Sequence, residues 1–178
     1  MRWLSVLALL LPAVGMANDW DALRSPGAVA IMRHALAPGT GDPEGFVLGD
    51  CATQRNLDAR GQAQARKIGQ EMRDRGIGFD VVLTSQWCRA RETAELLKVG
   101  PVAEATPLNS FYEDRASRDA QTEATRALIA QTEGRVMMVT HQVNISALTG
   151  QGAASGEVLV IVPQGAGFAV LGRILIAP

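Results

Sequence analysis

The chain has 178 residues, of which 47% are hydrophobic and 20% are charged. Such a length corresponds to one domain, since most domains contain about 100 to 200 residues, and the composition excludes a disordered, collagen-like or multi-span membrane protein. The formal net charge is −1, without a block of like charges, which argues against binding to nucleic acid or to an anionic membrane surface. Arginine outnumbers lysine by 15 to 2, and only the guanidinium group binds an oxyanion through two parallel hydrogen bonds.

Residues 1–17 have the pattern of a secretory signal peptide. Arg2 is followed by an apolar run from Val6 to Leu11 and by small residues that end at Ala17. The apolar run is too short to span a bilayer comfortably, and an uncleaved membrane anchor is the alternative. We expect removal of residues 1–17, export to the periplasm or secretion, and no stable membrane insertion of the remaining chain. Residues 18–178 are expected to form the one folded domain.

Hydrophobic periodicity and turn residues predict helices and strands that alternate through most of the remaining chain. In chain order we expect a short helix at 19–24, a strand at 28–32, a long loop at 38–49, a helix at 59–75, a strand at 79–84, a helix at 89–97, a short strand at 102–105, a helix at 116–131, a strand at 136–139, a helix at 143–148 and two late strands at 157–162 and 168–174. The alternation predicts a largely parallel sheet covered by helices on both faces, with the late strands antiparallel at one edge.

The inward faces of the helices are predicted from apolar residues repeated at helical spacing. Asp58 is expected to cap the helix at 59–75, and Gly76 is expected to end it. The predicted inward residues are Ala63, Ile68 and Met72 of this helix, Ala90, Ala94 and Leu97 of the next, and Ala120, Ala124, Ala127 and Leu128 of the helix at 116–131.

The two cysteines, Cys51 and Cys88, lie far apart in the sequence and belong to no CxxC or zinc-binding pattern. They are either two buried thiols or one disulfide, and an oxidising compartment favours the disulfide. It would join the loop before Gln54 to the turn that carries Arg89, with a stabilisation of about 3 to 4 kcal/mol from loop closure.

Polar side chains follow three of the predicted strands. Arg33 and His34 come after the first, Ser85 to Arg89 after the second, and His141 after a later one. Because the carboxyl ends of parallel strands meet at one edge of a sheet, where ligands bind, we expect these groups to converge. The chain has only two histidines, and both belong to this set.

This combination of residues fits phosphoryl transfer. A neutral imidazole can attack phosphorus and form a covalent phosphohistidine, while Arg33 and Arg89 bind the non-bridging oxygens through charge-assisted hydrogen bonds. His141 adds a further donor if it is protonated. Positioning and charge stabilisation carry such catalysis, so no metal or other cofactor is required in principle. A metal site on the two histidines and Asp114 is a weaker alternative, because the flanking arginines would repel a cation.

Four motifs, in this order, resemble those of the histidine phosphatase superfamily, which has the phosphoglycerate mutase fold. They are Arg33-His34; Leu57-Asp58-Ala59-Arg60-Gly61 with Gln62, Gln64 and Ala65; Ser85 to Ala94; and Val139-Thr140-His141. The resemblance covers nearly the whole of residues 18–178. It implies a three-layer α/β/α sandwich with a mostly parallel central sheet, no metal cofactor, His34 as the phosphorylated nucleophile, and Arg33, Arg89 and His141 as the phosphate pocket.

The sequence departs from the family pattern in two respects. Ala35 replaces the glycine of the first motif, which places a methyl group beside the phosphate pocket. The family's leaving-group acid is missing from both of its usual positions, where this chain has Ser110 and Gln142. Asp114 is therefore the first candidate for the acid and Glu113 the second, because both lie in the loop just after Ser110.

Other residues near these motifs are assigned smaller roles. Arg55 and Thr40 could contact the substrate from loops over the pocket, although a surface arginine and a turn threonine are the simpler interpretation. Arg91 points away from Arg89 on the helix surface and is expected to form a structural ion pair. Trp87 is expected to pack under the turn before Arg89.

The sequence thus predicts an exported, metal-independent phosphatase that hydrolyses a phosphomonoester through a phosphohistidine on His34. A protein phosphohistidine phosphatase, a mutase and a noncatalytic phosphate- or sugar-phosphate-binding module are the alternatives. Export disfavours the mutase, because it separates the protein from glycolytic substrates. The expected partner is a phosphorylated small molecule, with sugar phosphates of the cell envelope favoured by the compartment, and no nucleic acid.

Overall fold

The computed structural model of the chain describes residues 18–165 and 167–178. The predicted signal peptide, residues 1–17, lies outside these ranges, as does Ala166. Within the described ranges, no helix has both the length and the apolar composition needed to cross a membrane.

The centre of the fold is a mixed sheet with the strand order β3-β2-β4-β1-β5-β6. The strands span Val29–Arg33 (β1), Val81–Thr84 (β2), Val102–Glu104 (β3), Val136–Thr140 (β4), Val158–Gln164 (β5) and Gly167–Ile174 (β6). The pairs β1–β4, β2–β4 and β2–β3 are parallel, whereas β5 pairs antiparallel with β1, and β6 pairs antiparallel with β5. The predicted sheet, including its antiparallel edge, is confirmed with small changes at the strand ends.

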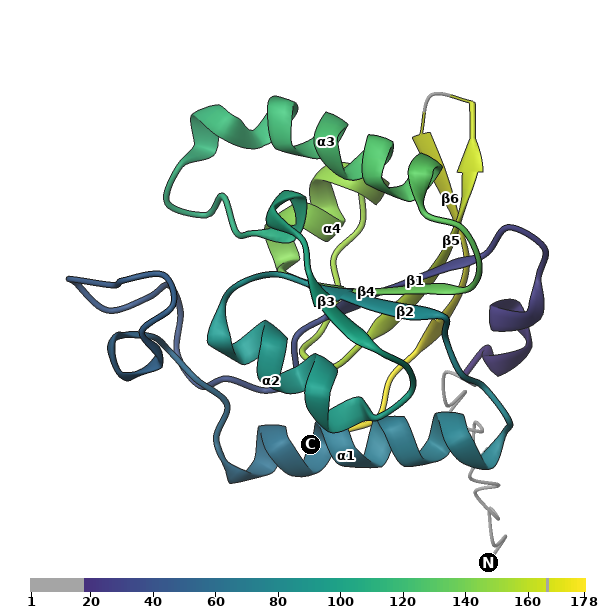
Figure 1. Cartoon of the computed structure of the whole chain (residues 1–178), viewed down its shortest axis with the longest axis horizontal. Helices are drawn as coiled ribbons and strands as arrows, with labels where there is room; N and C mark the ends of the chain where they lie inside the picture. Colours follow the sequence, from purple (N-terminus) through teal and green to yellow (C-terminus); the bar gives the residue numbers. More distant parts are fainter. Residues whose placement is uncertain (1–17, 166) are drawn as a thin grey trace, which may run out of the picture.

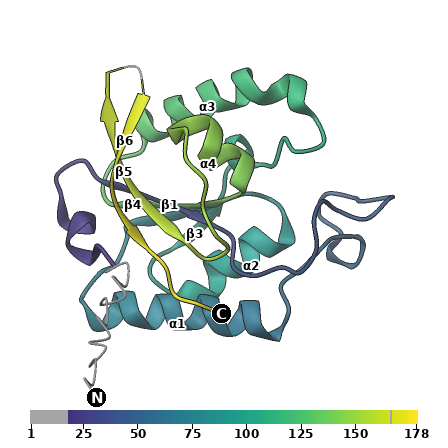
Figure 2. The ribbon, with the colours of Figure 1, turned by 180° about the vertical axis from the view of Figure 1, so that it is seen from behind.

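Helices cover both faces of the sheet (Figure 1). One face is covered by α1 (Ala59–Asp74) and α2 (Cys88–Leu97), and the other by α3 (Arg118–Gln131) and α4 (Gln142–Thr149). Short 3-10 helices lie at Trp20–Arg24, Cys51–Thr53, Thr106–Leu108 and Arg115–Ser117. The view from behind shows the same three layers (Figure 2). The predicted three-layer α/β/α sandwich is therefore confirmed.

Alternate residues of the central strands pack against the two helical layers. In β1, Ala30 and Met32 belong to the core beneath α1 and α2, whereas Val29 and Ile31 belong to the core beneath α3 and α4. All four side chains are buried. This burial explains why the strand is a continuous apolar run instead of an alternation of apolar and polar residues.

Some of the residues predicted to face inward from the helices are exposed. They are Ala63 of α1 and Ala120, Ala124 and Ala127 of α3. The inward positions of α1 include Ala65 in place of Ala63. In α3 only Thr125 is fully buried, with Leu128 packed against the sheet at its side. Alanine favours a helix by its backbone propensity even in solvent, so alanines alone do not identify the buried face.

The strand register brings the polar strand ends together. β4 lies between β1 and β2, and Arg33 is the partner of Thr140 across the β1–β4 ladder. The backbone N–H of His34 donates to the carbonyl of Thr140 (3.0 Å), and the N–H of Ser85 donates to the carbonyl of Val139 (3.0 Å). The residues that follow the three strands therefore leave the sheet side by side.

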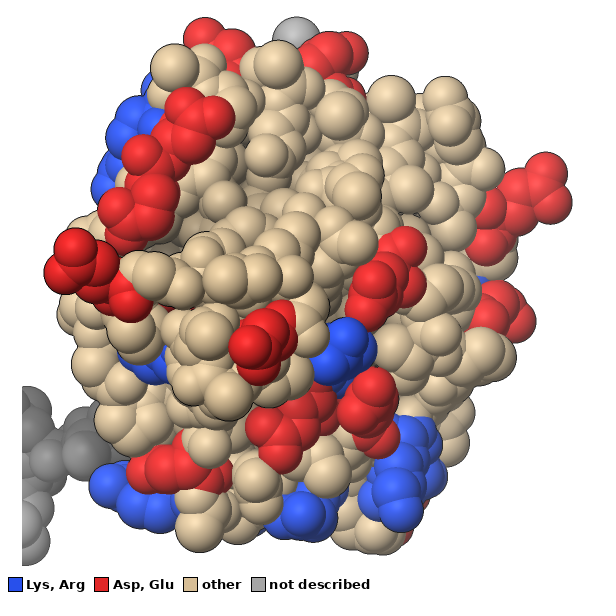
Figure 3. Space-filling model, turned by 60° about the vertical axis from the view of Figure 1, so that its left-hand side comes forward, with Lys and Arg blue, Asp and Glu red and all other residues tan. Residues whose placement is uncertain are grey.

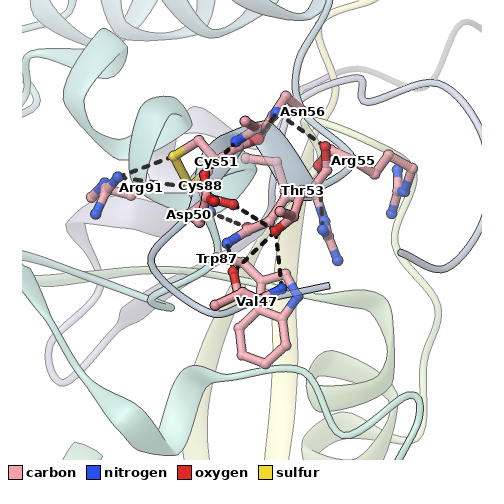
Figure 4. The surroundings of a disulfide bond; sticks show 12 residues. Val47, Asp50, Cys51, Thr53, Arg55, Asn56, Trp87, Cys88 and Arg91 are labelled. Carbon is pink, nitrogen blue, oxygen red and sulfur yellow. Dashed lines mark hydrogen bonds between the residues drawn. A yellow bond between two sulfur atoms is a disulfide. The ribbon is translucent and has the colours of Figure 1, made fainter. Parts of the chain in front are cut away.

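The long connection between β1 and α1 projects from the body of the molecule (Figures 1 and 2). It includes the predicted long loop at 38–49 and the short helix Cys51–Thr53. The predicted Cys51–Cys88 disulfide is confirmed and ties this connection to the first residue of α2 (Figure 4). The loop is thus covalently attached to the element that carries Arg89.

Charges are mixed on the surface of the molecule. On the face shown in Figure 3, acidic and basic side chains lie among uncharged ones, and the described residues form no continuous basic stripe on it. A basic stripe is typical of surfaces that bind nucleic acid. This face instead has the charge pattern expected from the near-neutral composition.

Candidate active site

A pocket of about 580 Å³ opens where the chain leaves the carboxyl ends of β1, β2 and β4. Several of the site residues predicted from the sequence line it: Arg33, His34, Thr40, Arg55, Arg89 and His141. The fold therefore brings segments that are far apart in the sequence into one cavity.

His34 is buried in this pocket as a neutral imidazole, with 2% of its surface exposed. Its Nδ1 lies 2.8 Å from the carbonyl oxygen of Ala35. Because a carbonyl only accepts, Nδ1 carries the ring proton and Nε2 keeps its lone pair. Burial and the nearby charge of Arg89 lower the pKa of His34 to about 3. At neutral pH, His34 is therefore an unprotonated base whose Nε2 can act as a nucleophile.

His141 is also buried and neutral. Its Nε2 lies 2.8 Å from the hydroxyl oxygen of Ser85, and its ring centre lies 5.5 Å from that of His34. Burial, together with the proximity of His34 and of the arginines, lowers the pKa of His141 well below its usual range. A protonated His141 is thus disfavoured unless an anion binds beside it.

Two arginines carry buried donors that make no hydrogen bond. Nη1 of Arg33 donates to the carbonyl of Ala153 (3.1 Å). Within the described part of the chain, however, Nε of Arg33 and Nε of Arg89 are buried without a hydrogen-bond partner. An unpaired buried donor costs about 1 to 3 kcal/mol, and more when the group is charged. An oxyanion in the pocket would relieve this cost.

Arg55 anchors the loop that forms one wall of the pocket. Its Nε donates to the carbonyl of Gly41 (2.7 Å), and its Nη1 donates to the carbonyl of Ala37. Burial and the charge of Arg89 lower the pKa of Arg55 to about 10, which leaves it charged at neutral pH. Arg55 is therefore not a free surface arginine, whereas Thr40 lies exposed at the rim.

The pocket also contains a carboxylate that no sequence motif indicated, that of Asp42. Its two oxygens accept from Nη1 and Nη2 of Arg89 at 2.6 and 3.1 Å. The indole Nε1 of Trp87 and the backbone N–H of Arg55 donate to the same carboxylate at 3.0 and 3.2 Å. Burial tends to raise the pKa of Asp42, but the hydrogen bonds and charge of Arg89 outweigh it and hold this pKa below its usual range.

Asp42 was missed because its surroundings in the sequence carry no pattern. It lies between Gly41 and Pro43, in a stretch without helical or strand periodicity. The only signal was the length of the loop, since long loops in compact domains are commonly functional.

Neither of the predicted acids lines the pocket. Asp114 is exposed and precedes the short helix Arg115–Ser117. Glu113 is exposed as well, with its carboxylate near Gly41. Among the lining residues of the described chain, Asp42 is the only one with a carboxylate.

The segment before α3 supplies cations to the pocket instead of an acid. Tyr112, Arg115 and Arg118 line the pocket and are exposed. Nε of Arg115 donates to the carbonyl of Tyr112 (2.8 Å), and its guanidinium carbon lies 4.8 Å from the centre of the Tyr112 ring. The mouth of the pocket is thus basic and carries an exposed aromatic ring.

The ring of Trp87 lies against the loop and against His141, not beneath the turn as predicted. Its ring stacks on Phe46 of the loop, with 5.2 Å between ring centres, and meets His141 edge-on at 5.5 Å. A buried indole N–H needs an acceptor, and Asp42 supplies it. Trp87 therefore contacts both the loop and the buried imidazole of His141.

The disulfide lies beside this loop (Figure 4). The side-chain oxygen of Gln54 accepts from the backbone N–H of Cys88 (2.9 Å), which adds a second link to α2. Arg91 lies next to the two sulfur atoms and forms the predicted ion pair with Glu104 (3.2 Å). Figure 4 shows Arg91 on the far side of the disulfide from Arg55.

Ala35 does not narrow the pocket, although it replaces a glycine of the family motif. Its methyl group is buried in a small cluster with Ala37, Leu57 and Ala65. Its backbone N–H donates to the hydroxyl of Thr93 (3.0 Å). Ala35 is absent from the pocket lining of the described chain, so the expected methyl group beside the phosphate is not found.

The alternative metal site is not formed in the described part of the chain. No three His, Cys, Asp or Glu side chains there are grouped so that they could hold a metal ion. Asp114, the third ligand considered for the two histidines, lies outside the pocket lining.

Comparison with known proteins supports the resemblance seen in the motifs. The family model of the histidine phosphatase superfamily (branch 1) matches residues 29–113. The serine/threonine-protein phosphatase Pgam5, mitochondrial, of Drosophila virilis is 40% identical over 50 residues. These residues are 28% of this chain and only 17% of that protein, so the similarity is local.

Solved structures show the same fold over most of the chain. SixA from Agrobacterium tumefaciens superposes with a TM-score of 0.58 at 23% identity, covering 85% of this chain and 99% of that one. The alpha-ribazole phosphatase from Shigella flexneri gives a TM-score of 0.59 at 17% identity, covering 83% of this chain and 96% of that one. The family model thus assigns residues 29–113 to the histidine phosphatase superfamily, and the four ordered motifs and the shared fold agree with this assignment.

Proposed function

We propose that the protein hydrolyses phosphomonoesters through a phosphohistidine intermediate on His34 and that it needs no metal ion. One juxtaposition carries this proposal. A buried imidazole whose Nε2 keeps its lone pair shares a pocket with two guanidinium groups whose buried Nε donors make no hydrogen bond within residues 18–165 and 167–178. The first supplies a nucleophile and the second supplies donors for the oxygens of a phosphoryl group.

In the first step Nε2 of His34 attacks phosphorus, so that an N–P bond forms as the bond to the leaving-group oxygen breaks. Arg33 and Arg89 bind the non-bridging oxygens, where charge is concentrated in the transition state. In the second step water attacks the phosphohistidine, the N–P bond breaks, and inorganic phosphate leaves. The dianion also favours protonation of His141, which then becomes a further donor.

The experiment that tests this mechanism is an assay of p-nitrophenyl phosphate hydrolysis in the presence of EDTA, comparing the wild type with His34→Ala. We expect the wild type to be active and the variant to be inactive. Acid quench of the wild type during turnover should trap phosphate on His34, seen as an added mass on the peptide that contains it. Activity retained in His34→Ala, or activity abolished by EDTA, would contradict the proposal.

We also propose that the protein acts outside the cytoplasm on a phosphorylated sugar of the cell envelope. The signal-peptide pattern of residues 1–17 and the Cys51–Cys88 disulfide support the compartment, because disulfides persist in oxidising environments. The exposed Tyr112 ring and the arginines at the pocket mouth suit a sugar that carries negative charge. Cell fractionation tests the compartment, and recovery of the full-length protein in the cytoplasm would contradict it.

A protein phosphohistidine phosphatase is the second candidate function. The absence of Glu113 and Asp114 from the pocket lining favours it, because an imidazole leaving group needs less help from an acid than an alcohol does. The structural neighbour SixA from Agrobacterium tumefaciens is named as a phosphohistidine phosphatase. Faster dephosphorylation of a phosphohistidine protein than of any sugar phosphate would favour this candidate. Binding of vanadate without turnover of either substrate would instead indicate a noncatalytic binding module.

A further inference from the structure

Asp42 carries the carboxylate of the described pocket lining, and the proposed mechanism gives it no role. It comes from the loop after β1, and its carboxylate is only 10% exposed. Arg89, Trp87 and the backbone of Arg55 all donate to it. A carboxylate with three donors that lines the same pocket as His34 belongs to the site and not to the surface of the loop.

The position of this carboxylate creates a competition for Arg89. Both Nη groups of Arg89 are bound by Asp42 in a bidentate pair, whereas Nε of Arg89 makes no hydrogen bond in the described chain. Asp42 accepts one N–H from each Nη group, and the carbonyl of Arg55 accepts another from Nη1 at 3.3 Å. A phosphoryl group can therefore bind first to Nε and to the remaining N–H of Nη2, and it occupies the Nη1–Nη2 edge only if it replaces Asp42. Carboxylate and phosphate are the two anions that the guanidinium fork recognises in this way.

Displacement from Arg89 changes the protonation of Asp42. Burial raises the pKa of Asp42, and the hydrogen bonds and charge of Arg89 are the largest of the effects that lower it, followed by the hydrogen bonds from Trp87 and from the backbone of Arg55. Once phosphate takes Arg89, the carboxylate loses this partner and lies beside a second anion, and both changes favour the protonated form. The remaining charged and titratable groups of the pocket lining are Arg33 and His34 after β1, Arg55 from the loop, Tyr112 and Arg115 before α3, Arg118 at the start of α3, and His141 after β4.

We infer, on the basis of the proposed function, that Asp42 is the proton donor to the leaving group and that the substrate phosphate itself releases it from Arg89. Protonated by solvent after this release, Asp42 gives its proton to the leaving-group oxygen as Nε2 of His34 bonds to phosphorus and the P–O bond breaks. The alcohol leaves and Asp42 is again a carboxylate. It then takes a proton from the water whose oxygen bonds to phosphorus as the N–P bond breaks. After phosphate dissociates, Asp42 releases this proton to solvent and rebinds Arg89 as a carboxylate.

The leaving-group dependence of Asp42→Asn tests this assignment. General acid catalysis contributes about 100-fold to 10,000-fold when the leaving group is poor, and p-nitrophenolate leaves without protonation. We therefore expect Asp42→Asn to lose at least about 100-fold in kcat on an alkyl phosphate and less than about tenfold on p-nitrophenyl phosphate. Asp42→Glu, which keeps a carboxyl group, should regain part of the alkyl phosphatase activity. Glu44→Gln, an exposed change on the same loop, is the matched control and should behave as the wild type.

Inhibition by inorganic phosphate gives a second, independent readout. Asn has no charge to compete for Arg89, so Asp42→Asn should bind phosphate more tightly than the wild type even if its turnover is low. Equal losses of kcat on the two esters, or weaker phosphate binding, would overturn the inference while leaving the phosphohistidine mechanism intact. A wild type that hydrolyses neither ester, or one that does not need His34, would overturn the proposed function, and the inference with it.

Discussion

His34 and His141 follow directly from β1 and β4, whereas Asp42 and Arg55 come from the long loop between β1 and α1. The first pair, which we call the sheet half of the pocket, is fixed by ladder hydrogen bonds such as the one from His34 to Thr140. The second pair, the loop half, is held by the side-chain bonds of Arg55 and by the disulfide next to it.

The two halves are held in place differently, and this difference matches their chemical roles. A nucleophile must keep its tautomer and its position through every turnover, which suits a buried residue at the end of a central strand. A carboxylate that yields Arg89 to phosphate must be able to move, which suits a loop. The two halves meet at Arg89, which is buried at the start of α2 and paired with Asp42.

Among the changes that test this comparison, removing Arg89 should have the largest effect on activity, because Arg89 contacts the loop half and binds the substrate phosphate beside the sheet half. Arg89→Ala loses a phosphate ligand and leaves Asp42 buried without its partner, so we expect kcat/KM to fall on the order of a thousandfold. Arg91→Ala is the matched control, two residues along the same helix, and removes a surface ion pair with Glu104 and contacts with the disulfide sulfurs, outside the pocket lining of the described chain. Steady-state kinetics on p-nitrophenyl phosphate measure both. Similar losses in the two variants would show that α2 acts through its general stability and not through Arg89.

Removing the disulfide should affect the loop half of the pocket more than the sheet half. Replacing Cys51 and Cys88 together by Ser is expected to lower the free energy of unfolding by about 3 to 4 kcal/mol, measured by urea denaturation. Because the disulfide lies beside the loop half, we expect KM to rise more than kcat falls. Wild type treated with a reductant is the control for the substitutions themselves. A fall in kcat with KM unchanged would mean that the loop also positions His34.

Lowering the pH should reduce the free energy of unfolding through His34, which belongs to the sheet half. His34 has a folded-state pKa of about 3, against about 6.5 in an unfolded chain. Between these two pKa values the unfolded chain binds more protons than the folded chain, so lowering the pH favours unfolding. The contribution of His34 to the free energy of unfolding is therefore complete above about pH 6.5 and is lost as the pH falls toward 3. For one proton, this loss is at most about 1.4 kcal/mol per pH unit. Urea denaturation at pH 7 and pH 4.5 measures the slope, and His34→Ala should reduce it. A stability independent of pH over this range would show that the imidazoles are not held neutral.

The sheet half could be predicted from the sequence, and the loop half could not. A continuous apolar run such as the one in β1 has one simple explanation, a strand buried on both faces, and its last residues must then lie at the sheet edge. This reasoning placed His34 and His141 in one pocket. It needed only short-range patterns and the rule for parallel sheets.

Asp42 depends on contacts that no short-range pattern encodes. Its carboxylate meets Arg89 and Trp87 across more than forty positions of sequence, and the turns between them have no repeat. The same limit explains the incorrect expectation for Asp114, which was chosen for its nearness to Ser110 in the chain. The exposed alanines of α3 show a similar limit for the prediction of buried positions. Alanine is favoured in a helix by its propensity as well as by burial, so its spacing does not identify the buried face.

Ala35 offers the smallest and most local test of the sheet half. Since its methyl group packs with Ala37, Leu57 and Ala65 and not in the pocket, Ala35→Gly should leave kcat/KM within about twofold while lowering the free energy of unfolding by about 1 kcal/mol. The backbone carbonyl that holds Nδ1 of His34 is kept in this variant. A gain in activity of tenfold or more would show that the methyl group obstructs the phosphate after all. Activity lost without a loss of stability would show instead that the added backbone freedom releases the ring of His34, and that its tautomer depends on a rigid residue at position 35.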